Sequence, residues 1–148
     1  MNTVQGSLIA GLVVGAMLLA GCGPRGQPEA AKAEPSRVEP IAGSDLSRVI
    51  LTEEAANRLD IQTDAVAHED VDGAEHTVIP YSAVLYDVEG QAFAYTSPEP
   101  FTYVRAPLEI DKIDGDVAVL TAGPDVGTAV VTVGAAELYG AEFEFSEG

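Results

Sequence analysis

Short segments rich in β-branched and aromatic residues recur from residue 61 onward at roughly ten-residue spacing, and they limit what this chain can fold into. Turn-forming pairs separate some of them, including Glu89-Gly90 and Asp114-Gly115, where a tight hairpin requires positive φ. The pattern predicts a mostly β fold, a small β-barrel or sandwich of about 6–8 short strands. The expected strands lie near residues 61–67, 75–79, 83–87, 91–96, 101–106, 108–113, 117–121 and 128–133.

One or two short helices are expected beside the strands. Thr52 is a candidate N-cap, and the two glutamates after it place negative charge in the first helical turn. Leu51, Ala55 and Leu59 recur four residues apart, which indicates one amphipathic face. Near the C-terminus, the segment GAAELYG could form a single helical turn that Gly140 ends.

The segment before the strands has the composition of a tether. Residues 22–47 contain four prolines with Ala, Glu and Gly between them, and such a sequence forms no periodic apolar face. We therefore expect a disordered, flexible linker over residues 22–47 and a folded β-domain over residues 48–148.

The N-terminus has the pattern of an export signal. Residues 1–21 carry no ionisable side chain, and the apolar run from residue 8 to residue 20 is 13 residues long. A membrane-spanning helix needs about 20 apolar residues, so this run has the length of a signal-peptide core instead. We assign residues 1–21 to a signal peptide.

The run is followed by Leu19, Ala20, Gly21 and Cys22, a sequence that resembles the lipobox of bacterial lipoproteins. The resemblance implies cleavage before Cys22 and a diacylglyceryl group on its sulfur. Two or more acyl chains anchor a protein stably to a membrane. The expected location is the exported, extracytoplasmic face of the cell membrane. The alternative is an unmodified Cys22 behind a weak transmembrane anchor.

Charge and composition exclude several functions. The chain has 24 acidic against 7 basic residues, a net charge of −17, which opposes binding to nucleic acid. It also opposes contact with anionic lipids. A single Cys forms neither an internal disulfide nor a multi-cysteine metal site. Since the sequence also has no nucleophile elbow and no phosphate-binding loop, we expect no enzymatic activity and no cofactor other than the lipid.

The segment from His68 to His76 holds two imidazoles with four carboxylates between them. Such a set could ligate a divalent metal ion. The spacing fits no standard zinc or calcium pattern, and the other interpretation is a solvated acidic hairpin loop.

Aromatic residues on the expected strands are interpreted as core and cross-strand pairs, with a ligand-stacking surface as the alternative. They are Tyr81, Tyr86, Phe93, Tyr95, Phe101 and Tyr103. Three further aromatic residues, Tyr139, Phe143 and Phe145, could either pack the C-terminus against the domain or present a docking edge.

Three motifs follow one another along the chain: VIPYSAVLYDVEGQAFAYT, FTYVRAPLEI and IDGDVAVLTAGPDVGTAVVTVGAAEL. In order and spacing they resemble the C-terminal part of periplasmic adaptor subunits, or membrane fusion proteins, of RND-type efflux systems. The opening LTEEAANRLDIQTDAV resembles the start of the same adaptors. The matching residues are Ile79-Pro80, Ala83-Val84, Gly90, Phe93, Tyr95, Val104-Arg105, Gly115-Asp116, Val119, Gly123, Gly127, Val130-Val131 and Gly134-Ala135.

The resemblance implies that the two ends of the domain come together as a membrane-proximal β-domain. Full adaptors insert a lipoyl domain, a helical hairpin and a second β-barrel where this chain has only residues 68–76. The implied function is that of a transport accessory, which docks on an integral-membrane transporter or an envelope protein. The alternatives are a stand-alone ligand- or metal-binding lipoprotein and a structural envelope protein.

Overall fold

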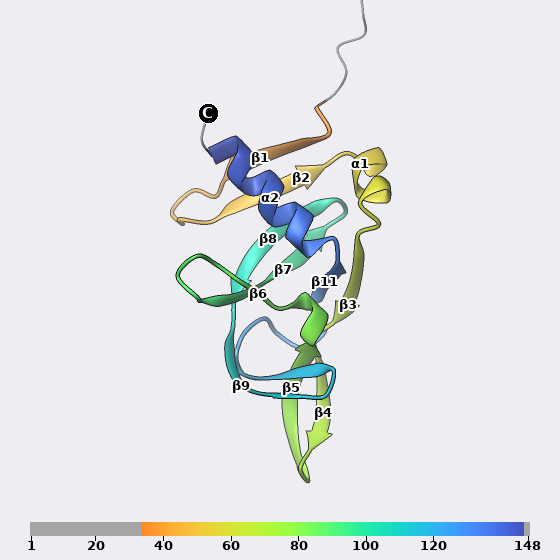
Figure 1. Ribbon diagram of the computed structural model, residues 1–148, viewed down its shortest axis with the longest axis vertical. Coiled ribbons are helices and arrows are strands. Elements are labelled where there is room, and N and C mark those ends of the chain that lie inside the picture. The colour runs from red at the N-terminus through yellow and green to blue at the C-terminus, as the bar shows by residue number, and fades with distance from the viewer. Residues whose placement is uncertain (1–33, 147–148) are drawn as a thin grey trace, which may run out of the picture. The chain divides into compact units, whose positions relative to one another are not determined.

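The computed structural model describes residues 34–146, with side chains up to residue 144, and within this range the fold is mostly β (Figure 1). The strands are β1 Ser36–Pro40, β2 Ser47–Leu51, β3 Gln62–Ala65, β4 Ala67–Val71, β5 Ala74–Pro80, β6 Leu85–Tyr86, β7 Ala92–Glu99, β8 Thr102–Pro107, β9 Glu109–Asp114, β10 Val117–Ala122 and β11 Ala129–Val133. The helices are α1 Glu53–Arg58, α2 Ala135–Ser146 and the short 3-10 turn η1 Tyr81–Ala83.

The strands form two antiparallel sheets, which confirms the expected fold class. The larger sheet has the order β1-β2-β8-β7-β11-β3, with β6 added on β7, and the smaller has the order β4-β5-β10-β9. Both sheets have free edges, so neither closes into a barrel. The described residues contain more strands than the 6–8 expected from the sequence.

The two ends of the domain pair as the adaptor resemblance implied. β3, which follows α1, lies antiparallel to β11, with Ala65 opposite Ala129 and Thr63 opposite Val131. Val131 is fully buried in the main core, which also holds Tyr95 and Leu138. A second cluster around Ile79 and Val130 links the two sheets.

Helix α1 forms as the sequence predicts. The Thr52 hydroxyl accepts a hydrogen bond from the Ala55 backbone N–H at 3.1 Å, the expected N-cap contact. Ala55 and Ala56 are buried against β2, and Arg58 pairs with Glu54 one turn earlier at 3.0 Å.

The assignment of residues 22–47 to a flexible linker is wrong in its last part. β1 lies within that range and pairs along its length with β2, from Ser36 opposite Leu51 to Pro40 opposite Ser47. Val38 packs against the main core. Two of the four prolines that indicated a tether, Pro35 and Pro40, stand just before this edge strand and at its end. Proline is tolerated there because its missing N–H breaks no ladder. Residues 22–33, like the signal peptide 1–21, lie outside the described residues.

The acidic segment 68–76 is a regular hairpin between β4 and β5. Asp72 and Gly73 form its two-residue turn, with φ of 56° and 83°. Positive φ at both central positions is the type I′ geometry that suits the twist of paired strands. The interpretation as a solvated acidic hairpin loop therefore identified the turn but missed β4, whereas β5 matches the strand expected at residues 75–79.

The smaller sheet curls around a small apolar cluster. β4 and β9 are its two edges, yet Lys112 on β9 donates a hydrogen bond to Asp72 at the end of β4. This hydrogen bond, with the charge attraction, lowers the pKa of the Asp72 carboxyl and raises the pKa of the Lys112 ammonium. The face between them buries Val71, Val78 and Val119.

Helix α2 does not end at Gly140 but continues to Ser146. Ala135, Leu138 and Glu142 lie on one face at helical spacing and are buried against the larger sheet. Their packing outweighs the cost of about 1 kcal/mol for glycine in a helix. Sequence propensity at Gly140 alone therefore gave the wrong helix end.

Two glycines around α2 should respond to alanine in opposite ways. At Gly140 an added Cβ would meet no atom within 4 Å, so Gly140→Ala should stabilise the protein by about 1 kcal/mol. At Gly134, φ is +82° and the added Cβ would overlap Ile61 Cδ1 and lie 3.2 Å from the Leu59 carbonyl oxygen. Gly134→Ala should therefore destabilise by about 2 kcal/mol or more. Urea unfolding followed by circular dichroism measures both, and equal effects would contradict this assignment.

Candidate functional site

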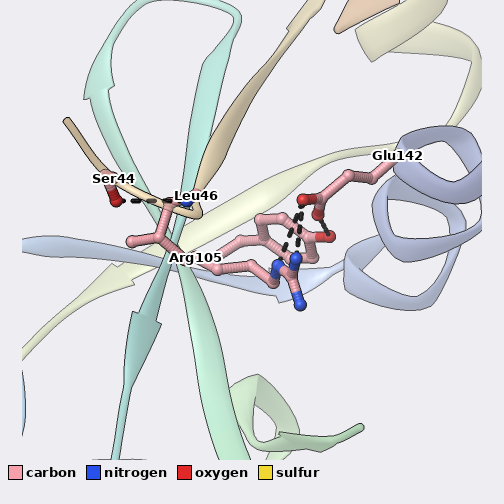
Figure 2. A network of polar contacts seen from close by, with 5 residues as sticks. Ser44, Leu46, Arg105 and Glu142 are labelled. Atoms are coloured by element: carbon pink, nitrogen blue, oxygen red, sulfur yellow. Dashed lines mark hydrogen bonds and ion pairs between the residues drawn. The ribbon is translucent and has the colours of Figure 1, made fainter. Parts of the chain in front are cut away.

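A buried polar network joins α2 to the centre of the larger sheet (Figure 2). The Glu142 carboxylate accepts a hydrogen bond from the Tyr95 hydroxyl at 2.6 Å. Its other oxygen accepts from Arg105 Nε at 3.2 Å and from Arg105 Nη2 at 2.9 Å. Tyr95 and Arg105 lie opposite each other on β7 and β8. Because Glu142 is only 4% exposed, these bonds compensate a carboxylate that is otherwise removed from water.

Aromatic rings enclose the Arg105 guanidinium. Its central carbon lies 5.5 Å from the centre of the Phe93 ring and 6.0 Å from that of Phe143. Both distances are within the range of a cation–π interaction. Tyr139 contacts both rings, at 5.4 Å from Phe93 and 4.7 Å from Phe143 between ring centres. The network therefore fixes α2 through one ion pair and a group of tilted and edge-on aromatic contacts.

Burial, and then the hydrogen bond to Glu142, raise the pKa of Tyr95 well above its usual range. An unfolded tyrosine loses its proton near pH 10, while the native Tyr95 keeps it. Its contribution to stability is therefore complete below about pH 10 and falls at higher pH by about 1.4 kcal/mol per pH unit. Tyr95→Phe should remove this decline. The measurement is the free energy of unfolding of the unmodified chain and of Tyr95→Phe between pH 9 and 11. Equal slopes of this free energy against pH for the two chains would contradict the buried hydrogen bond.

A cleft of about 360 Å³ opens on the other side of Arg105, between two hairpin tips. One tip is the turn between β1 and β2, where the Ser44 hydroxyl accepts a hydrogen bond from the Leu46 N–H at 3.1 Å (Figure 2). The other tip is the loop between β6 and β7, which projects from the same side of the domain (Figure 1). The residues that line the cleft include Asp45, Asp87, Gln91, Phe93, Arg105 and Pro107. We call this space the tip cleft.

The β6–β7 loop is held in one conformation by its own hydrogen bonds. Asp87 Oδ1 accepts from the backbone N–H groups of Glu89 at 2.9 Å and Gln91 at 2.8 Å. The Gly90 N–H donates to the Asp87 carbonyl at 3.0 Å, and Gly90 takes φ of 82°. Val88, at the loop's end, is 91% exposed, and Tyr86 beside it is 52% exposed. The loop thus presents an apolar side chain on an ordered support.

A second groove, of about 330 Å³, lies between α1, α2 and the start of β1. Its lining is largely apolar, with Leu51, Ala55 and Leu59 on one side and Gly140 and Ala141 on the other. This groove differs from the tip cleft in the elements that line it. None of its lining residues comes from a loop that carries an exposed apolar side chain.

The two histidines singled out in the sequence do not converge. His68 lies opposite Thr77 in the hairpin, while His76 lies opposite Glu69. Neighbouring positions on a strand point to opposite faces, so the two imidazoles project from opposite sides of the hairpin. Among the described residues, no group of three or more His, Cys, Asp or Glu side chains is arranged to hold a metal ion. The arrangement thus offers no joint site for the two histidines.

The expected lipid-attachment residue, Cys22, and the cleavage residues Leu19, Ala20 and Gly21 lie outside the described residues. Within the part of the chain that the structure covers, no helix has both the length and the apolar character needed to cross a membrane.

The aromatic residues divide between core and surface. Phe93, Tyr95 and Tyr103 are buried, as core residues should be, and burial raises the pKa of Tyr103. Tyr81 and Tyr86 are exposed. Of the C-terminal group, Tyr139 packs back onto Phe93, and Phe143 packs against Tyr139. Phe143 also stays 43% exposed, and the Phe145 side chain lies outside the described residues.

Sequence reasoning named Phe93 and Arg105 but missed Glu142 and the importance of Val88 next to the tip cleft. Glu142 is one of 24 acidic residues, and no local pattern distinguishes the buried one from the exposed ones. Val88 lies between Asp87 and Glu89-Gly90, and that turn signal was available. An apolar residue inside a predicted turn was therefore the one signal that could have been used.

Comparison with known proteins gives one structural similarity. No protein-family model and no curated protein sequence matches the chain. The chain is similar to a solution NMR structure of part of SilB from Cupriavidus metallidurans CH34, which encompasses the N-terminal metal-binding site and the membrane-proximal domain of that protein. The TM-score is 0.41 at 16% sequence identity, over 64% of this chain. The match spans 59% of the SilB fragment, less than two thirds of its length.

Proposed function

We propose that this chain is a non-enzymatic, lipid-anchored envelope protein whose β-domain docks on a membrane transporter or another envelope partner. The domain would work from the exported face of the cell membrane, as an accessory to transmembrane transport. The observation that carries the proposal is the order of the adaptor-like motifs along strands that pair in the implied way. β3 and β11, from the two ends of the resemblance, are hydrogen-bonded neighbours.

Four of the five glycines in the adaptor-like motifs support it in detail. Gly90, Gly115, Gly127 and Gly134 all have positive φ, between 57° and 90°. Each stands between two elements of the fold, at a place where other residues would be strained. The motif residues are therefore those that the turns of this domain require, which supports a shared domain type.

The connection between β4 and β5 limits the proposed role. Where full adaptors insert further domains, this chain turns in two residues at Asp72 and Gly73. The resemblance therefore supports docking by a membrane-proximal domain alone. It does not support a bridge across a wide envelope.

The proposal is tested by membrane-impermeant crosslinking on intact cells that carry the full-length chain with a C-terminal affinity tag. The expected product, after solubilisation and mass spectrometry, is a conjugate with one integral-membrane or envelope protein. A matched tagged lipoprotein of unrelated fold is the control, and it should not give the same conjugate. Recovery of the uncrosslinked chain alone would contradict the proposal.

A further inference from the structure

We infer that the β6–β7 loop and the tip cleft form the surface that binds the partner, and that the partner presents an apolar hollow bordered by Lys or Arg side chains. This inference rests on the proposed function and goes beyond it, because it names the contact surface and the chemistry of the protein that fits it. Three observations carry it: an exposed apolar residue in the loop, the hydrogen bonds that order the loop, and the charge around it.

Val88 is the most exposed of the large apolar residues in the described part of the chain. It is 91% exposed, against 40–52% for the others. Single exposed apolar residues are common on protein surfaces, but Tyr86, two positions earlier at the end of β6, adds a second exposed aromatic side chain at 52%. A concave partner would remove these exposed apolar side chains from water.

The loop that carries Val88 needs little ordering to bind. Asp87 makes two side-chain hydrogen bonds to the loop's backbone, and its own N–H donates to the Gln91 carbonyl at 3.0 Å. Binding by a loop that is already in one conformation avoids the entropy cost of ordering a flexible one.

The charge around the tip cleft indicates which partner surfaces it can bind. Asp45 and Asp87 line the tip cleft, and Glu89 follows Val88. Arg105 is the one basic residue that lines the cleft, and its guanidinium is paired with Glu142 on the side of α2. The net charge at the cleft is therefore negative, in a chain of net charge −17. A volume of about 360 Å³ has room for a Lys or Arg side chain from the partner. Complementary charge speeds encounter and excludes acidic surfaces.

The experiment places a photo-crosslinking amino acid at position 88 of the full-length chain in intact cells. The matched control carries it at position 126, since Val126 is a 47% exposed valine in the β10–β11 loop. We expect position 88, but not position 126, to crosslink an extracytoplasmic segment of a membrane or envelope protein. Mass spectrometry should map the adduct to a peptide that contains apolar residues together with Lys or Arg.

Two variants then measure the contact with the membrane-impermeant crosslinker. Val88→Asp should lower the yield of the partner conjugate about tenfold or more, because it removes the buried apolar group and adds a like charge. Val126→Asp should leave the yield within about twofold. Thermal melts followed by circular dichroism should coincide for both variants and the unmodified chain, since both positions are on surface loops.

The outcomes separate this inference from the proposed function. A conjugate that forms through position 126 alone overturns the docking surface, and so does a conjugate whose yield Val88→Asp leaves unchanged. Either result would still leave a partner, as the proposed function requires. An adduct at position 88 on a peptide without basic residues overturns the inferred partner chemistry. Absence of any conjugate, with either crosslinker, overturns both.

Discussion

Replacing Glu142 with alanine should lower the free energy of unfolding by about 3 kcal/mol. The change leaves the Arg105 guanidinium without its carboxylate at a site where the Arg105 side chain is 21% exposed. It also removes the hydrogen-bond acceptor of the Tyr95 hydroxyl, which is buried. Both losses act on the contact between α2 and the larger sheet. Urea unfolding followed by circular dichroism gives the difference directly.

Glu144→Ala is the matched control, because Glu144 is an exposed glutamate on the same helix. It should change stability by less than about 0.5 kcal/mol. A double variant, Glu142→Leu with Arg105→Met, removes both charges and should recover a large part of the loss. If Glu142→Ala were no more destabilising than Glu144→Ala, the buried network would not hold α2 in place.

Replacing Cys22 with alanine should abolish lipid attachment altogether. The chain contains one cysteine, so a thioether-linked lipid has a single site in the sequence. Cells grown with an alkyne-labelled fatty acid should label the unmodified chain and leave Cys22→Ala without label. The unmodified chain should partition into the detergent phase of a cloud-point extraction, as acyl chains require.

One control accompanies this experiment. Val88→Asp keeps the lipid site and should be labelled as fully as the unmodified chain. Equal labelling of Cys22→Ala, or absence of label from the unmodified chain, would remove the anchor from the proposed function. Either result would concern the lipid anchor alone and would not contradict the fold or the proposed role of the tip cleft.

The parts of the fold that follow local rules were predictable. The N-cap at Thr52 and the glycines in tight turns form because of contacts within a few residues, and such signals are visible in the sequence. β1 was not predictable in the same way. The segment around it, with Pro35 and Pro40, has the composition of a linker. It becomes a strand because β2 pairs with it and Val38 packs against the core.

The candidate site depends on contacts between residues far apart in the chain. Glu142 meets Tyr95 across 47 residues and Arg105 across 37, so neither its burial nor the length of α2 follows from local propensity. Asp45 and Asp87 line one cleft only because β2, β8, β7 and β6 lie next to one another. The histidines failed as a site for the opposite reason. Their closeness in sequence suggested a shared ion, but the strand register places them on opposite faces.

The central claim, that this domain works by holding a membrane or envelope partner, is tested most directly by the size of the crosslinked species from intact cells. The measurement is the sedimentation of the tagged, full-length chain after membrane-impermeant crosslinking and solubilisation. The account predicts that the chain sediments with an integral-membrane or envelope protein, in a species far larger than its own 15.3 kDa. Sedimentation of the chain as a detergent-bound monomer, with no partner in the same fractions, would contradict it.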